Sequence, residues 1–349
     1  MGMLAQRVDH VIGVDTHRDS HTAAVLDTTG GVIADLTVPA DAFGYKRVLA
    51  FGRTHAPERR AWAIEGTGSF GSGLTTFLLE QGEWVVEIDR PARPARRNGA
   101  KSDELDAARA AREALARDHL AQPRCRGDRE AIRVLLVTRN GAVVSRTRAI
   151  AHLKALLVTA REQLRNHFRN MSTDDQVIRC SRLRTAPTQA SEHRSTIMAM
   201  RSTARRILAL EAEANDLESE IERLVKGVAP WLLEERGVGA FSAAQVLCSW
   251  SHPGRLRSEA AFAALGGSAP VPASSGQTVR HRLNRGGDRQ LNRALHTIVL
   301  SRLAHDDETK AYAARRRAEG KSPREIKRCL KRHLARRLFK LLETSAGGA

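Results

Sequence analysis

Two short apolar segments near the N-terminus each end on a carboxylate, and this pattern restricts the fold more than any other feature of the sequence. Residues 11–14 lead into Asp15, and residues 61–64 lead into Glu65. Short apolar runs bounded by polar turns are typical of buried strands. A carboxylate that ends such a strand is displayed at the edge of a sheet, toward a cleft. For Asp15 alone, the competing interpretation is a turn carboxylate that caps the next segment.

The segments around these two predict a mixed sheet with helices packed on it. Residues 10–27 read as a strand hairpin, residues 32–38 and 84–88 as further strands, and the segment after Glu65 as a helix. Gly66 and Gly68 lack the third glycine and the Lys-Ser/Thr pair of known phosphate loops, so they are a weak nucleotide motif. We therefore expect an α/β N-terminal domain.

A third acidic stretch follows, in a segment that reads as a helix capped by Ser102. Asp103 and Asp106 are three residues apart, so both carboxylates leave the same face of this helix. Like charges on one face repel each other, which makes sense if a divalent cation or a basic partner lies between them. Asp15 and Glu65 are placed to join this pair.

The overall charge indicates a polyanionic partner. The chain has 57 Lys and Arg residues against 39 Asp and Glu residues, a formal net charge of +18. Nucleic acid is the simplest such partner, and a membrane surface is the weaker alternative because the basic stretches are dispersed. We find neither a long apolar run nor a signal-peptide pattern, and expect a soluble, cytoplasmic protein with no membrane partner. Four scattered cysteines exclude the usual zinc spacings.

The middle of the chain, from about residue 128 to residue 226, reads as helical. Between 207 and 224 apolar residues follow a heptad pattern, at Ile207, Leu210, Ala214, Leu217, Ile221 and Leu224. Two interpretations stand beside each other: an intramolecular helical hairpin, or an arm for self-association. The polar stretch 169–194 is predicted to be a loop.

The C-terminal part combines a glycine turn, a serine loop and a basic tail. Gly237 and Gly239 before an alanine-rich helix resemble a helix-hairpin-helix, in which backbone N–H groups meet a phosphate. A Gly/Ser/Pro-rich loop containing Ser275 is ordinarily only a loop. Arginines close behind it, however, are suited to hold a DNA phosphate against a serine nucleophile; these are Arg280, Arg282, Arg285 and Arg289. Residues 315–340 add twelve basic residues, which favours phosphate binding over a merely solvated helix face.

The ordered set of motifs resembles the DEDD transposases of the IS110 group, relatives of the Piv/MooV-type DNA invertases. The N-terminal motifs are Val11-Ile12-Gly13-Val14-Asp15, Ile64-Glu65-Gly66-Thr67-Gly68 and Lys101-Ser102-Asp103-Glu104-Leu105-Asp106-Ala107. The C-terminal motifs are Arg236-Gly237-Val238-Gly239, Ala263-Ala264-Leu265-Gly266, Ala269-Pro270, Ser274-Ser275-Gly276 and Arg285-Gly286-Gly287-Asp288. No single motif is specific, but the combination covers most of the chain in the family's order.

The resemblance implies a RuvC-like, ribonuclease-H-type catalytic domain over residues 1–125, a helical coiled-coil region over 126–226 and a C-terminal transposase domain over 227–349. Asp15, Glu65, Asp103 and Asp106 would bind Mg²⁺ or Mn²⁺, and Ser275 would be the nucleophile. The family exchanges double-stranded DNA guided by a structured bridge RNA, so we expect DNA and RNA partners and a homodimer or homotetramer.

The chain departs from the family pattern in small ways. Ser102 stands where threonine is usual, and Gly267-Ser268 where a large apolar residue usually follows the glycine. Ser274 and the more distant Ser268 are alternative nucleophiles.

Two rival functions remain at this point. The first is a RuvC-like nuclease or junction resolvase that uses metal-activated water, with Ser275 only structural. The second is a nucleic-acid-binding protein whose catalytic centre is inactive.

Overall fold

The computed structural model describes residues 3–88, 102–118, 120–124, 126–272, 281–284 and 286–346. The chain forms two compact units, each assembled from separate stretches of sequence. The first comprises Met1–Gly127, Ser249–Asn292 and Lys321–Ala349, and the second comprises Asp128–Cys248 and Arg293–Gly320. The division at 125 and 226 into three domains stays a prediction.

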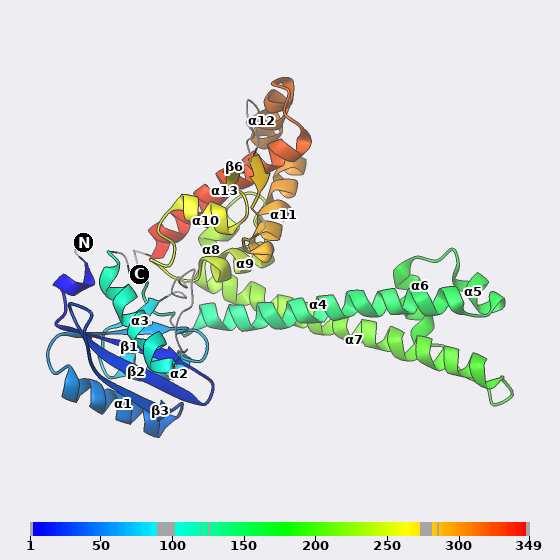
Figure 1. Ribbon diagram of the computed structural model, residues 1–349. Coiled ribbons are helices and arrows are strands. Elements are labelled where there is room, and N and C mark those ends of the chain that lie inside the picture. Colours follow the sequence, from blue (N-terminus) through cyan, green and yellow to red (C-terminus); the bar gives the residue numbers. More distant parts are fainter. Residues whose placement is uncertain are drawn as a thin grey trace. The chain divides into compact units, whose positions relative to one another are not determined.

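The N-terminal part of the first unit is an α/β domain built on a five-stranded mixed sheet in the order β3-β2-β1-β4-β5 (Figure 1). A short 3₁₀ helix, η1 (Leu4–Gln6), precedes the sheet. The strands are β1 (His10–Thr16), β2 (Ser20–Asp27), β3 (Val32–Pro39), β4 (Arg60–Glu65) and β5 (Val85–Ile88). β1 pairs antiparallel with β2 and parallel with β4. The predicted hairpin and the three other predicted strands are confirmed.

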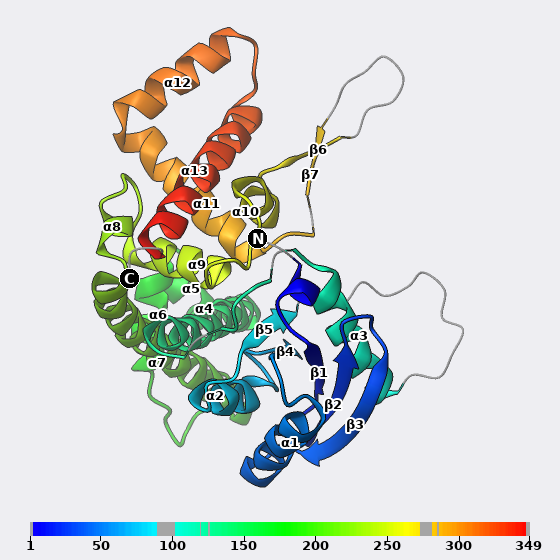
Figure 2. The ribbon, with the colours of Figure 1, turned by 90° about the vertical axis from the view of Figure 1, so that its left-hand side faces the viewer.

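Helices cover both faces of this sheet. The helix α3 (Asp103–Ala116) lies on one face, and α1 (Ala42–His55) and α2 (Ser72–Glu80) lie on the other (Figures 1 and 2). Small residues bring α3 unusually close to the sheet, because a Cβ atom on Gly13 of β1 would come within 2.0 Å of the carbonyl oxygen of Ala107. The backbone of α3 therefore rests directly on the centre of β1.

The core of the second unit is a long helical hairpin. The helices α4 (Asp128–Thr159) and α7 (Ser191–Val228) lie side by side along it (Figure 1). Ile207, Ala214 and Ile221 of the predicted heptad are buried within this chain, and Arg146 of α4 pairs with Glu211 of α7 at 2.8 Å. These three heptad residues thus pack within an intramolecular hairpin, and the role of an arm for self-association stays a prediction.

The prediction of a loop over 169–194 is wrong for residues 173–181 and from residue 191 onward, where helices form. The helices α5 (Glu162–Phe168) and α6 (Thr173–Ser181) occupy the far end of the hairpin, and α7 already begins at Ser191. Ser172 caps α6, and only Val177 and Cys180 are buried, in the cluster that also holds Met200 of α7. Two apolar residues are too few to predict a helix from sequence, and packing on α7 stabilises it.

The remaining elements are mostly helical, as predicted for the C-terminal part. In chain order they are α8 (Pro230–Leu233), α9 (Ala240–Trp250), α10 (Glu259–Leu265), β6 (Pro270–Pro272), β7 (His281–Leu283), α11 (Arg289–His305), α12 (Asp307–Ala318) and α13 (Pro323–Ala346). The strands β6 and β7 pair antiparallel. No described helix has both the length and the apolar character needed to cross a membrane.

A buried histidine in β2 predicts acid sensitivity of the N-terminal domain. His21 is fully buried and stacks on Tyr45 of α1, with ring centroids 5.8 Å apart. Burial lowers the pKa of His21, so the unfolded state binds more protons than the folded state once the pH falls below about 6.5. Stability contributed by the neutral ring is therefore lost as the pH falls from that value.

We expect His21→Phe to flatten the decline of the melting temperature between about pH 7.5 and pH 5.5. His55→Gln, at an exposed position of α1, is the control and should leave the decline as in the unaltered protein. Equal slopes for the His21→Phe and unaltered proteins would contradict the prediction.

Candidate functional site

The carboxyl ends of β1 and β4 place two of the predicted metal ligands at the same edge of the sheet. Val14 of β1 is in register with Ile64 of β4, so Asp15 and Glu65 are the next residues of two adjacent parallel strands. The Thr16 hydroxyl donates a hydrogen bond to the Glu65 carbonyl oxygen at 2.9 Å, which links the strand ends. Because strand residues alternate between faces, Asp15 and Glu65 share the face on which Ala61 and Ala63 pack against α3.

The first turn of α3 brings the third carboxylate to this edge. Ser102 caps the helix by accepting a hydrogen bond from the N–H of Leu105. Asp103 is the first helical residue, and the contact of α3 with Gly13 places this helix end over Asp15. An oxygen of Asp15, one of Asp103 and a ring nitrogen of His17 all lie within 4.8 Å of one another.

His17 is the residue that sequence reasoning missed. Its Nε2 lies 3.2 Å from Oδ2 of Asp15 and 3.5 Å from Oδ1 of Asp103, between the two carboxylates. The sequence signal was its position two residues after Asp15, at the start of the turn to β2. Asp103 is far from His17 in the sequence, and only the packing of α3 on the sheet brings its carboxylate next to the ring.

Electrostatics favour a cation here. Asp15 is the more enclosed carboxylate, with 13% of its side chain exposed against 48% for Asp103. Burial raises the pKa of Asp15, and the negative charges of Asp103 and Asp106 raise it further, against a lowering effect of His17. Among the described residues, no Lys or Arg forms an ion pair with Asp15 or Asp103, although the chain carries a net charge of +18.

The two other predicted metal ligands are Asp106 and Glu65. Asp106 is close enough to affect Asp15, but its Oδ1 accepts a hydrogen bond from Arg109 at 2.5 Å. Glu65 is the next residue of the adjacent strand, but it lies outside the group formed by Asp15, His17 and Asp103. Carboxylate oxygens of this kind suit Mg²⁺ or Mn²⁺, so the residues present fit a divalent cation.

The predicted serine loop lies largely outside the described residues. This applies to Ser274, Ser275, Arg280 and Arg285, and to the side chain of Arg282, while Arg289 is exposed at the start of α11. The strands β6 and β7 on either side of the loop pair antiparallel. The alternative Ser268 is buried, and its hydroxyl donates to the carbonyl oxygen of Ala263 at 2.9 Å, which is a structural role.

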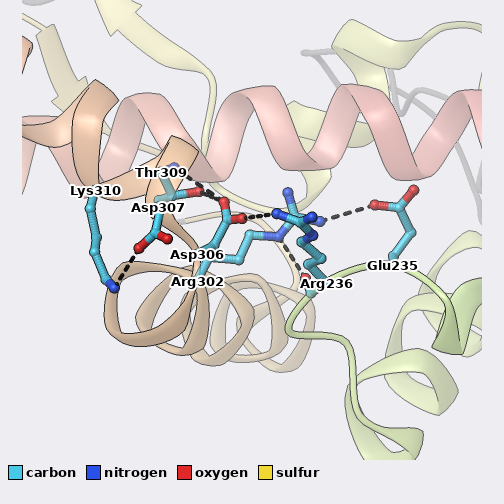
Figure 3. A network of polar contacts seen from close by, with 7 residues as sticks. All are labelled: Glu235, Arg236, Arg302, Asp306, Asp307, Thr309 and Lys310. Carbon is cyan, nitrogen blue, oxygen red and sulfur yellow. Dashed lines mark hydrogen bonds and ion pairs between the residues drawn. The ribbon is translucent and has the colours of Figure 1, made fainter.

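The predicted glycine turn is anchored by a polar network (Figure 3). Gly237 has a positive φ of 76°, and a Cβ atom there would lie 3.1 Å from the Ile298 carbonyl oxygen, so the turn lies close to α11. Arg302 donates to the Arg236 carbonyl oxygen at 2.7 Å and to Glu235 at 3.0 Å. Gly239, in contrast, has open space around it.

Asp306 completes this network. It accepts hydrogen bonds from Thr309 and, at 2.6 Å, from Arg236, which together lower its pKa to about 2. Gly237 and Arg236 therefore serve to position the turn against α11 and α12. Contact with nucleic acid at Gly237 and Gly239 stays a prediction.

Comparison with known protein families identifies the class of protein to which the chain is similar. Residues 12–161 match a family model for the DEDD transposases of the IS110 type, and residues 229–314 match a second model, described as the transposase IS116/IS110/IS902 family. Domains of this type imply an enzyme that cleaves and joins DNA. Within that class, the chain carries both domains of the IS110 type, in that order along the sequence.

Two curated relatives come from insertion elements. An uncharacterized 43.6 kDa protein of insertion element IS110 from Streptomyces coelicolor is 31% identical over 35% of this chain, and the match spans 31% of that relative. An uncharacterized 42 kDa protein of insertion element IS900 from Mycobacterium paratuberculosis is 26% identical over 88% of this chain and 89% of the relative. The second match extends over both transposase domains.

Proposed function

We propose that this protein is an insertion-sequence transposase that cleaves and exchanges DNA strands with a metal-assisted serine nucleophile. The observation that carries the proposal is the meeting of Asp15, His17 and Asp103 at the carboxyl end of β1, inside a region that matches a DEDD transposase model. The mixed five-stranded sheet is in keeping with a RuvC-like, ribonuclease-H-type catalytic domain.

Asp15 and Asp103, with Glu65 and Asp106, are the residues that would hold Mg²⁺ or Mn²⁺. A bound divalent cation neutralises phosphate charge and stabilises the attacking and leaving oxygens of a phosphoryl transfer. The enclosed Asp15 would provide a fixed ligand at the strand end, and Asp103 is the more exposed of the two carboxylates. The Nε2 atom of His17 lies between the two carboxylates and is placed to donate its N–H to Asp15.

Ser275 is the proposed nucleophile. Its hydroxyl loses a proton, Oγ forms a bond to phosphorus, and the bond between phosphorus and the sugar oxygen of the departing strand breaks as that oxygen gains a proton. The covalent protein–DNA intermediate keeps the bond energy, so rejoining needs no ATP. The basic residues beyond Ser275 support this assignment through their suitability for a phosphate.

Further parts of the proposal rest on the resemblance to the IS110 group. We include a structured bridge RNA as guide, a kinship with the Piv/MooV invertases and assembly into a dimer or tetramer. The net charge of +18 supports polyanionic partners but assigns no basic residue to DNA or to RNA.

Covalent trapping tests the nucleophile. The protein is incubated with Mg²⁺, the RNA transcribed from its element and labelled junction DNA, then separated on a denaturing gel. We expect a slowly migrating protein–DNA adduct that is lost in Ser275→Ala and kept in the matched control Ser274→Ala. Cleaved ends without an adduct would favour the metal-dependent nuclease, and binding without cleavage would favour the inactive DNA-binding protein.

A further inference from the structure

Lys331 of α13 is buried, which is unusual for a lysine. Only 7% of its surface is exposed, whereas lysines almost always keep the ammonium group in water unless it is paired. Taking an unpaired charge out of water costs stability. Among the described residues, no carboxylate forms an ion pair with Lys331, so its burial calls for an explanation.

The carboxylates Glu259 and Asp288, which lie in neighbouring parts of the chain, already form contacts with other residues. Glu259 of α10 pairs with Arg336 and Lys340 of α13. Asp288 caps the start of α11 and also accepts a hydrogen bond from the Ser249 hydroxyl at 2.6 Å. Burial, with the nearby charge of Arg328, lowers the pKa of Lys331, as expected when no anion is close by.

Asn292 holds the ammonium group in a defined position. The Nζ atom donates to Oδ1 of Asn292 at 3.1 Å, and Nδ2 of Asn292 donates to the Gly266 carbonyl oxygen at 2.5 Å. The second bond fixes the orientation of the amide, so its oxygen must face the lysine. An ammonium group has three N–H donors, and Asn292 uses one of them.

This position is at the base of the β6–β7 hairpin. Gly267 follows Gly266 with a positive φ of 64°, and a Cβ atom there would lie 2.9 Å from Nδ2 of Asn292, so no side chain fits. The chain then enters β6, the first strand of the hairpin. Lys331, Asn292 and the Gly266–Gly267 turn therefore form one built unit.

We propose that Lys331 is an anion-binding residue that receives a phosphodiester oxygen of the nucleic-acid substrate at the base of the β6–β7 hairpin. The two N–H donors left by Asn292 suit a phosphate oxygen. Three further cations on α13, namely Arg324, Lys327 and Arg332, form no ion pair with another described residue, and Arg324 and Arg332 are exposed. The choice of ligand rests on the proposed function, because a DNA-processing enzyme supplies the phosphodiester.

The test compares Lys331→Met with Lys226→Met, which removes the same charge from an exposed lysine paired with Glu222. Binding of a labelled double-stranded DNA oligonucleotide is measured between about 0.05 and 0.2 M salt, together with the melting temperature of the free protein. We expect Lys331→Met to bind the DNA roughly tenfold more weakly. The slope of log K against log salt concentration should become shallower by about 0.9, the value expected for the loss of one phosphate contact. Its melting temperature should equal or exceed that of the unaltered protein, because an unpaired buried charge is removed.

A lysine with only a structural role gives the opposite result. A lower melting temperature with an unchanged salt slope would overturn the proposal, and so would no change in either quantity. If Lys331→Met does not fold, Lys331→Gln removes the charge, keeps a donor for Asn292 and gives the same comparison. DNA binding by the unaltered protein without strand cleavage would refute the recombinase proposal and leave the Lys331 comparison valid.

Discussion

Asp15→Asn is expected to reduce DNA strand cleavage by about 10³-fold or more while nucleic-acid binding stays close to that of the unaltered protein. A bound divalent cation would supply several kcal/mol of transition-state stabilisation, which corresponds to a factor of this size. Asparagine keeps the shape of the side chain and removes the charge that would hold the cation. The basic residues that we propose to bind nucleic acid keep their charges in this variant.

The same variant gives a readout that does not depend on activity. Asp15 is a largely buried carboxylate whose pKa is raised by burial and by Asp103 and Asp106. Removing its charge should leave the metal-free melting temperature unchanged or higher. Added Mg²⁺ should raise the melting temperature of the unaltered protein but not that of Asp15→Asn.

Asp19→Asn is a matched control, because Asp19 is exposed in the adjacent turn and pairs with Arg18. Cleavage at the level of the unaltered protein by Asp15→Asn would exclude Asp15 from the metal site. Loss of cleavage in both variants would show that the effect is not specific to this carboxylate.

Gly13→Ala is expected to lower the free energy of unfolding by about 3 kcal/mol. The added Cβ atom would lie 2.0 Å from the Ala107 carbonyl oxygen and 2.8 Å from the Ala111 nitrogen, both of which are backbone atoms of α3. Backbone in a helix has no rotamer with which to avoid this clash, so α3 must move away from β1. Chemical denaturation measures the loss.

The displacement of α3 should also impair catalysis. Asp103 is at the start of this helix, and a misplacement of about 1 Å can cost roughly 10²-fold in rate. We therefore expect Gly13→Ala to lose cleavage at temperatures where it is still folded. Gly141→Ala is the control: Gly141 lies inside α4 with open space around it, and alanine there should stabilise by about 0.5–1 kcal/mol. Full cleavage by folded Gly13→Ala would contradict the positioning role of this contact.

Local sequence patterns predicted the elements that carry the carboxylates. Apolar runs that end at Asp15 and Glu65 were recognisable as strands, and Ser102 marked the start of α3. These signals are short-range, because they depend on alternation and on a capping side chain. The helix α6 was not predicted from its local pattern, because only two of its residues are buried and its stability comes from packing on α7.

The sequence by itself determined the succession of strands and helices, the positive charge and the positions of the acidic residues, since each is a property of neighbouring residues. Only the tertiary structure decided that His17 contacts Asp103, that the backbone of α3 packs against Gly13, and that Lys331 is buried beside Asn292. Each of these is a contact between distant parts of the chain. Such contacts depend on how the elements pack, which no local pattern records.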